Sequence, residues 1–257
     1  MKKLFKLSLP VSLILILSSA GFIHCSPDSL SKTPETPELI RSNIGAKGTK
    51  LSIEFHKGLA HNHPSFAIWL ETVDGQFIQT LFVTRYVATG IFGHGELAPG
   101  KWRADSGPAV RPATLPYWLH KRGVKTGNIP DLPSPENPVP DAISGATPVA
   151  DFILKTNSSA EIPSKFRLLM EINQPWDANR YWTNSKYSDD PDYITSLQPA
   201  LVYSVTIDLD SEITEYYLNP IGHSHYSGKD GNLYTDLSTF TTALNIANQI
   251  IVHVSNR

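Results

Sequence analysis

The stretch that decides the fold lies at residues 65–84 and reads SFAIWLETVDGQFIQTLFVT. Two apolar runs, residues 65–71 and 76–84, are separated by the tetrapeptide TVDG at residues 72–75. Aspartate and glycine both tolerate a positive φ, so an Asp-Gly step between two apolar runs is typical of a β-hairpin turn. The stretch therefore predicts two neighbouring antiparallel strands.

Further strand-like runs lie on both sides of this hairpin. They are rich in threonine and aromatic residues, as strands are, and cover residues 51–56, 150–155, 166–173, 201–209, 213–218 and 249–254. Only residues 237–247 suggest a short helix, because Phe240, Leu244 and Ala247 would share one helical face. Many short strands divided by turn signals indicate a mainly β protein, an antiparallel immunoglobulin-like β-sandwich.

Residues 99–148 differ in character from the rest of the chain because prolines recur throughout them. Proline lacks a backbone N–H and is excluded from central strands, so we expect a long irregular segment. Long segments of this kind in compact domains are often functional. Trp102, Tyr117 and Trp118 predict that this one packs on the sandwich.

The first 24 residues have the layout of a secretory signal peptide. Lys2, Lys3 and Lys6 precede an apolar run at residues 7–23 that has small residues, 18–21, near its end. This run is short for a membrane span, and no later run is longer and equally apolar. We therefore expect residues 1–24 to direct export and to be removed.

Cys25 is the only cysteine and directly follows the signal peptide. A lone cysteine cannot form an internal disulfide, whereas bacterial lipoprotein processing cleaves before a cysteine and attaches lipid to its sulfur. Residues 22–25, FIHC, depart from the usual lipobox and resemble relaxed forms of it; cleavage after Ala20 is the alternative. We expect a cell-envelope lipoprotein, facing the periplasm or held in the outer membrane.

The rest of the chain is expected to divide into a tether and one domain. Residues 25–50 are rich in serine, proline, threonine and charge, which favours a lipidated flexible tether. Residues 51–257 then form a single sandwich domain with the irregular segment embedded at residues 99–148. Membrane attachment through the lipid anchor is the expected consequence.

The net charge and the motifs that are missing argue against several classes of function. Lys plus Arg number 22 and Asp plus Glu number 24, for a net charge of -2, which does not favour a nucleic-acid partner. The chain has no Gly-x-Ser-x-Gly elbow, Walker loop or dinucleotide fingerprint. Nothing in the sequence therefore indicates a serine hydrolase, an NTPase or a nicotinamide enzyme, and whether the protein is an enzyme stays open.

One short motif carries chemistry: residues 141–148 read DAISGATP. The pattern Asp-x-x-Ser/Thr-Gly-Ala-Ser/Thr resembles the flavinylation motif of FMN-binding domains, in which a flavin transferase joins FMN to the last hydroxyl through a phosphoester. The resemblance implies Thr147 as the acceptor, Asp141 as the acid of the motif, and Ser144, Gly145 and Ala146 as its turn. Pro148 departs from that pattern. The same residues also suit a tight structural turn in which Thr147 is a cap.

A second resemblance covers about residues 50–210. WLETVDG at residues 69–75, LPYWLHKRG at 115–123 and SGATP at 144–148 occur in this order. Together they resemble an uncharacterised family of bacterial periplasmic proteins, a domain of unknown function with an immunoglobulin-like sandwich. Its members are associated with flavin-transferase and membrane-flavoprotein systems of extracytoplasmic electron transfer.

The second resemblance implies an accessory component of such a system, with a flavin transferase and membrane flavoproteins as partners. If FMN is bound covalently, its isoalloxazine requires an aromatic surface, for which the candidates are Tyr117, Trp118, Trp176 and Trp182. The same side chains also suit core packing. A non-catalytic binding or structural lipoprotein of the envelope is the alternative function.

Two His-x-His pairs, His61/His63 and His223/His225, suggest a metal site as a further alternative. Alternate residues of a strand share a face, so each pair could present two nitrogens to one ion. A carboxylate would complete the His223/His225 site; the candidates are Asp208, Asp230 and Asp236. A polar loop is the structural alternative. His61 and His63 are expected in an exposed loop, and the aspartates of residues 189–192 in a solvated acidic turn.

Overall fold

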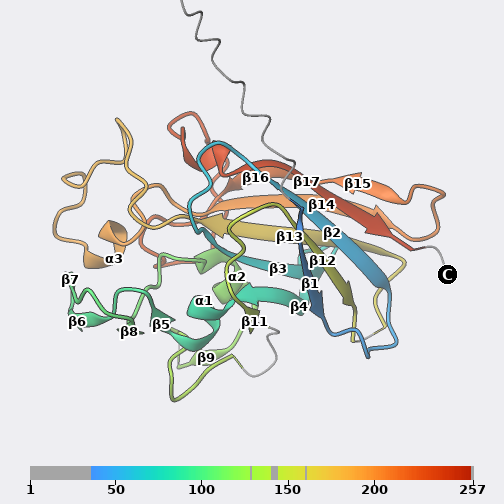
Figure 1. Cartoon of the computed structure of the whole chain (residues 1–257), viewed down its shortest axis with the longest axis horizontal. Helices are drawn as coiled ribbons and strands as arrows, with labels where there is room; N and C mark the ends of the chain where they lie inside the picture. The colour runs from blue at the N-terminus through green and yellow to red at the C-terminus, as the bar shows by residue number, and fades with distance from the viewer. Residues whose placement is uncertain (1–35, 128, 140–143, 160, 256–257) are drawn as a thin grey trace, which may run out of the picture. The chain divides into compact units, whose positions relative to one another are not determined.

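Two facing β-sheets form the framework of the protein (Figure 1). The structure is a computed structural model that describes residues 36–127, 129–139, 144–159 and 161–255, which belong to one compact unit. The five-stranded sheet has the order β1 (Glu38–Ser42), β12 (Phe152–Asn157), β2 (Lys50–Lys57), β17 (Ala247–Val254) and β15 (Glu215–Tyr217). The mainly β, sandwich-like fold predicted from the sequence is confirmed.

The six-stranded sheet carries the other half of the core. Its order is β11 (Ser144–Gly145), β4 (Phe77–Thr84), β3 (Ser65–Thr72), β13 (Lys165–Asn173), β14 (Leu201–Asp208) and β16 (Asn219–His223). Side chains that alternate along the strands meet between the sheets. Phe152, for example, stacks on Phe55 and Phe66, with ring centroids 4.9 and 5.2 Å away.

The predicted hairpin is confirmed at the centre of the six-stranded sheet. Strands β3 and β4 pair antiparallel, and the Gly75 N–H donates to the Thr72 carbonyl at 2.9 Å. Gly75 has a φ of 82°, the left-handed conformation for which glycine suits this turn. Strand β3 is buried on both faces, because Trp69 points away from the core between the sheets and is nevertheless 0% exposed.

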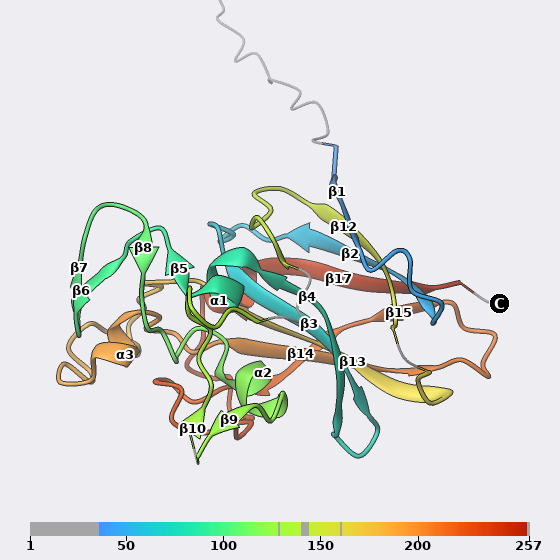
Figure 2. The ribbon, with the colours of Figure 1, turned by 90° about the horizontal axis from the view of Figure 1, so that it is seen from below.

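A layer of short elements covers the outer face of the six-stranded sheet, as Figure 2 shows. We call residues 85–139 the cover segment. Its helices are α1 (Arg85–Thr89) and α2 (Pro116–Lys121). Its paired short strands are β5 (Ile91–Phe92) with β8 (Gly107–Pro108), β6 (Glu96–Ala98) with β7 (Lys101–Trp102), and β9 (Lys125–Thr126) with β10 (Ile129–Pro130). Trp118 and Tyr117 of this segment are buried against the sheet, so the predicted packing on the sandwich is confirmed.

The amino-terminal part of the described chain differs from the expected tether. Residues Glu38–Ser42 form β1, which pairs parallel with β12 at the edge of the five-stranded sheet. Ile40 is the one apolar residue of this strand that packs against the main core. A single apolar position makes no periodic pattern, which is why the sequence did not predict the strand. Strand β16 was also not predicted; it too is an edge strand, and it contains Pro220.

The helix predicted at residues 237–247 is wrong; only Ala243–Asn245 form a single 3-10 turn. The buried Gln198 side chain accepts a hydrogen bond from the Thr241 N–H at 2.9 Å, a bond that a helix would have given to its own backbone. One further short helix, α3 (Pro191–Ile194), lies in the connection between β13 and β14.

Candidate functional site

The N-terminus of helix α2 is capped by a buried carboxyl group from a strand of the sheet. Its own N-cap residue, Leu115, provides no side-chain acceptor. Instead the Tyr117 and Trp118 backbone N–H groups donate to Glu171 of β13 at 3.1 and 2.8 Å. Burial raises the pKa of Glu171 to about 8, even though these two hydrogen bonds act in the opposite direction. The long-range cap fixes the cover segment to the sheet.

Contacts with the hairpin fix the other side of α2. The Trp118 indole N–H donates to Thr80 Oγ1 at 3.0 Å. Lys121 Nζ donates to the Gly75 carbonyl at 2.9 Å and lies 3.8 Å from the buried Glu71 carboxylate. Residues 115–123 therefore meet the hairpin of residues 69–75 directly.

Ser144 and Gly145 form β11, which pairs parallel with Val83 and Thr84 at the end of β4. A Cβ on Gly145 would lie 3.0 Å from the Phe82 ring, so glycine permits the close approach. All three segments on which the family resemblance rests therefore contact β3 or β4 of one sheet.

The hydroxyl group of Thr147, the expected flavin acceptor, is shielded in this arrangement. Thr147 Oγ1 is shielded from solvent and has no hydrogen-bond partner among the described residues, whereas the neighbouring Ala146 is exposed. Asp141 lies outside the described residues. Three of the aromatic candidates for flavin stacking are buried: Tyr117, Trp118 and Trp182. The fourth candidate, Trp176, is 41% exposed, so the shielded hydroxyl and the three buried rings are what do not fit a phosphoester-linked flavin.

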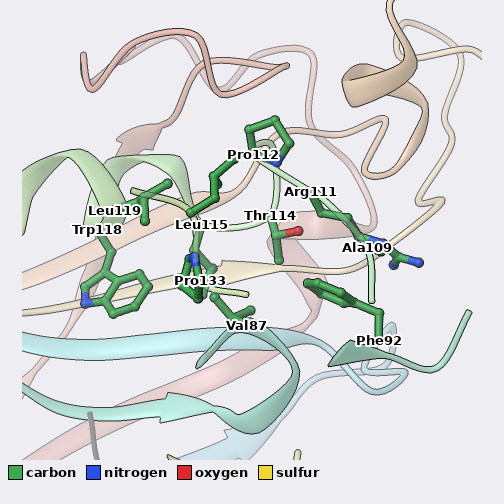
Figure 3. A pocket seen from close by; sticks show the side chains of 11 residues that line it. Val87, Phe92, Ala109, Arg111, Pro112, Thr114, Leu115, Trp118, Leu119 and Pro133 are labelled. Carbon is green, nitrogen blue, oxygen red and sulfur yellow. The ribbon is translucent and has the colours of Figure 1, made fainter. Parts of the chain in front are cut away.

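An apolar cavity of about 20 Å³ lies within the cover segment (Figure 3). Its lining residues are Val87, Phe92, Ala109, Arg111, Pro112, Thr114, Leu115, Trp118, Leu119, Leu132 and Pro133. A cavity of this size has room for about one water molecule. It is therefore a packing void rather than a ligand site.

A larger groove of about 170 Å³ lies on the other side of Leu119. Its lining residues are Pro112, Leu119, His120, Ile129, Pro130, Leu132, Gly228 and Lys229. His120 Nε2 lies 3.2 Å from the Gly228 carbonyl, which joins α2 to the loop after β16. Gly228 has a φ of 75°, and a Cβ there would overlap the Pro112 carbonyl. Apolar walls and two basic side chains therefore converge from remote parts of the chain.

The predicted metal histidines divide between a strand and a turn, because β16 ends at His223. His223 Nδ1 lies 2.8 Å from the Ser224 carbonyl, and His225 Nδ1 accepts the Ser227 N–H at 3.1 Å. Burial lowers the pKa of both imidazoles, which favours the neutral form that metals bind.

The candidate carboxylates are distributed unevenly around these histidines. Asp230 accepts the Tyr234 hydroxyl at 2.9 Å, and its charge acts on His225. Asp208 lies at the opposite end of β14 from His223 and pairs with Lys165 at 3.4 Å. Within the described ranges, no group of three or more His, Cys, Asp or Glu side chains is placed to hold a metal ion. The metal site stays a prediction.

Two smaller expectations need correction. His61 is not simply solvated: its ring lies 5.7 Å from Phe55, and burial lowers its pKa. Asp190 is not part of a solvated turn, because it caps α3 by accepting two backbone N–H groups and pairs with Lys229 at 3.0 Å.

No pattern in the sequence indicated the cluster around Arg111. This side chain is only 9% exposed, and its guanidinium carbon lies 4.4, 4.9 and 5.6 Å from three aromatic ring centres. The rings belong to Phe92, Trp102 and Trp176. Burial lowers the pKa of Arg111 to about 10. Only the tertiary fold brings these segments together, so no local pattern could have indicated the cluster.

Comparisons of the chain with protein-family models, curated proteins and solved structures find no match in any of the three. Among the residues that the structure describes, no helix has the length and apolar character needed to cross a membrane. The geometry described above is therefore the basis for assigning a function.

Proposed function

We propose that this chain is a cell-envelope lipoprotein, anchored through Cys25, that acts as a non-catalytic accessory component of an extracytoplasmic flavin-linked electron-transfer system. One observation supports the proposal above the others. The three segments that carry the resemblance, residues 69–75, 115–123 and 144–148, are assembled on β3 and β4 of one sheet. Segments that are scattered in sequence thus belong to one structural unit.

The groove beside α2 is the surface on which we place the membrane-flavoprotein partner. Its apolar lining suits an apolar patch on the partner, and the Lys229 side chain at its rim already pairs with Asp190 at 3.0 Å. Ile129 stands at this groove with 71% of its surface exposed. The buried cap at Glu171 holds α2 in place before any partner arrives, which limits the entropy lost on binding.

Covalent FMN at Thr147 is the sharper form of the proposal. The motif and the unpartnered hydroxyl support it, but the shielding of that hydroxyl requires the turn to open before a transferase could reach it. The form that we favour is therefore an accessory protein that carries no covalent flavin of its own. A flavin transferase remains a proposed partner of the system.

The proposal is tested by affinity capture from detergent-solubilised membranes of a host that expresses a flavin transferase and a membrane flavoprotein. The readout is in-gel flavin fluorescence. We expect a fluorescent band at the mass of the membrane flavoprotein and none at the mass of the bait. Ile129→Glu should weaken the capture, whereas Ile213→Glu, at a site 57% exposed and outside the groove, should not. Absence of any fluorescent band would refute the proposal.

Intact mass distinguishes the two forms of the proposal. The protein is co-expressed with a flavin transferase that is active on a known acceptor, beside a Thr147→Ala control. No mass increment supports the non-covalent form. An increment of one FMN that is lost in Thr147→Ala would replace it with a covalent flavoprotein.

A further inference from the structure

We propose that Trp176, His94 and Arg111 form a binding site for a planar ring ligand that carries a carboxylate or phosphate group. The site lies where the β5–β8 and β6–β7 pairs of the cover segment approach the connection between β13 and β14. Figures 1 and 2 both place α3 beside β6 and β7. The proposal is independent of the electron-transfer function.

The backbone at Trp176 is strained in a way that exposes its ring. Trp176 has a φ of 56°, a left-handed conformation that bulky side chains rarely adopt. Its N–H donates to the Thr195 carbonyl at 3.2 Å, and its carbonyl accepts the Ala178 N–H at 3.0 Å. The side chain is nevertheless 41% exposed. An exposed indole in this backbone conformation is available for contact with a ligand.

The surroundings of Trp176 hold the indole as a fixed platform. The His94 ring meets it nearly edge-on, with the two centroids 5.4 Å apart. His94 is itself fixed, because its Nδ1 lies 3.2 Å from the Arg103 carbonyl. The guanidinium of Arg111 lies 5.6 Å from the indole centre. A rigid, partly exposed aromatic ring of this kind is suited to stacking on a second ring at low entropic cost.

Arg111 supplies a positive charge without a matching carboxylate. Phe92 and Trp102 pack on the guanidinium, and one of its five N–H donors bonds to the His94 carbonyl at 2.8 Å. Its Nε is shielded and has no hydrogen-bond partner, and no carboxylate of the described chain lies within ion-pair distance of the guanidinium.

The carboxylate whose charge acts on Arg111 is that of Glu96, which raises the pKa of Arg111. This carboxylate accepts the Val110 N–H at 3.0 Å. A buried charge that lacks a direct partner is unfavourable, so an anion brought by a ligand would compensate it. A stacked ring next to a guanidinium therefore selects ring ligands with a negative substituent and disfavours cationic ones.

The test uses a matched pair of probes, indole-3-acetate and its neutral amide, indole-3-acetamide. Binding to the purified protein is followed by ligand-observed saturation-transfer NMR. We expect the acid to bind at least about fivefold more tightly than the amide, since a charge-assisted contact contributes on the order of 1 kcal/mol or more. Arg111→Met should reduce the affinity for the acid to that for the amide, because it removes the positive charge and keeps a long side chain.

Trp176→Asn should abolish binding of both probes while the protein still folds. Asparagine tolerates a left-handed backbone, so this variant removes the ring without adding strain. A thermal melt checks that the fold is retained. Tyr181→Ala is the matched control, because Tyr181 is 50% exposed in the same connection but packs on Trp182 and Lys186 instead. It should leave both affinities unchanged.

Three results would overturn the assignment. These are equal affinity for acid and amide, no saturable binding of either probe at millimolar concentration, and undiminished binding in folded Trp176→Asn. Capture of a membrane flavoprotein through the α2 groove could still succeed in each case, so failure here is distinguishable from failure of the proposed function.

Discussion

The Glu171 carboxylate accepts the backbone N–H of Trp118 at 2.8 Å, so a strand of the sheet caps a helix of the cover segment. Glu171 is completely buried and has no ion-pair partner within the described part of the chain. Helix α2 is too short to be stable alone, and tertiary contacts must supply its stability. One carboxylate therefore couples the cover segment to the sandwich.

The first prediction concerns the pH dependence of stability. Burial raises the pKa of Glu171 from 4.5 to about 8, so the folded protein keeps a proton there that the unfolded chain has lost. The free energy of unfolding should therefore fall as pH rises between these values, by up to about 1.4 kcal/mol per pH unit. Glu171→Gln should remove this contribution. Urea unfolding across that range measures it.

The readout for Glu171→Gln is the slope of the free energy of unfolding against pH. The absolute stability is not the readout, because the amide places an N–H₂ group opposite a backbone donor and destabilises the variant at every pH. Glu212→Gln is the control, since Glu212 is exposed. An unchanged slope in Glu171→Gln would contradict the raised pKa.

The second prediction concerns the turn at residues 144–147. Gly145→Ala should destabilise the protein by about 1–3 kcal/mol, because the new methyl group would press on the buried Phe82 ring. Ala146→Ser, at the exposed neighbouring position, should have almost no effect. Denaturant unfolding compares the two. Equal stability of both variants would mean that the close packing of β11 on Phe82 does not stabilise the protein.

The third prediction concerns Lys121. Lys121→Met should destabilise the protein by about 1–3 kcal/mol, since it removes the bond to the Gly75 carbonyl and a nearby positive charge from the buried Glu71. Lys125→Met, at an exposed position in β9, is the control. If the midpoints of thermal unfolding shift equally, the Lys121 contacts do not stabilise the folded state.

The fourth prediction belongs to the histidine-based metal hypothesis. It requires stoichiometric zinc in the purified protein and its loss in the double variant His223→Ala/His225→Ala. Both imidazoles are held with a lowered pKa and are available in the neutral form. Elemental analysis after gel filtration measures the metal. Equal zinc content in the two proteins would exclude these histidines as ligands.

The fifth prediction belongs to the lipid anchor. Cys25→Ser should move the protein from the membrane fraction to the aqueous phase in detergent partitioning, because the sulfur that accepts lipid is lost. Intact mass of the unaltered protein should include a diacylglyceryl group. Partitioning of the unaltered protein into the aqueous phase, as for Cys25→Ser, would indicate ordinary cleavage after Ala20 instead.

Local chemistry predicted part of this structure. The hairpin at β3 and β4 follows from an Asp-Gly turn between two apolar runs, and both signals lie within one short stretch. The buried alternation of β2 likewise predicted a strand with one face in the core. The burial of Trp118 against the sheet followed from the size and apolar character of the tryptophan side chain.

The edge strand β1 and the failed helix at residues 237–247 show where local pattern was insufficient. Strand β1 is held by pairing with β12, and the Thr241 N–H is bound by Gln198, so partners from elsewhere in the chain decided both. The motif at residues 144–147 indicated a turn, but only the fold shows that Thr147 Oγ1 is shielded. Local sequence cannot report the exposure of a hydroxyl.

The sequence by itself determined the β-rich character and the central hairpin, and it is the sole basis for the export that we expect. Each of these depends on neighbouring residues, whose turn preference or apolar period acts over a few positions. The tertiary structure alone decided the Glu171 cap and the meeting of Arg111 with Trp176. Both join segments far apart in the chain, and such contacts form only when burial of the whole core offsets the entropy of bringing those segments together.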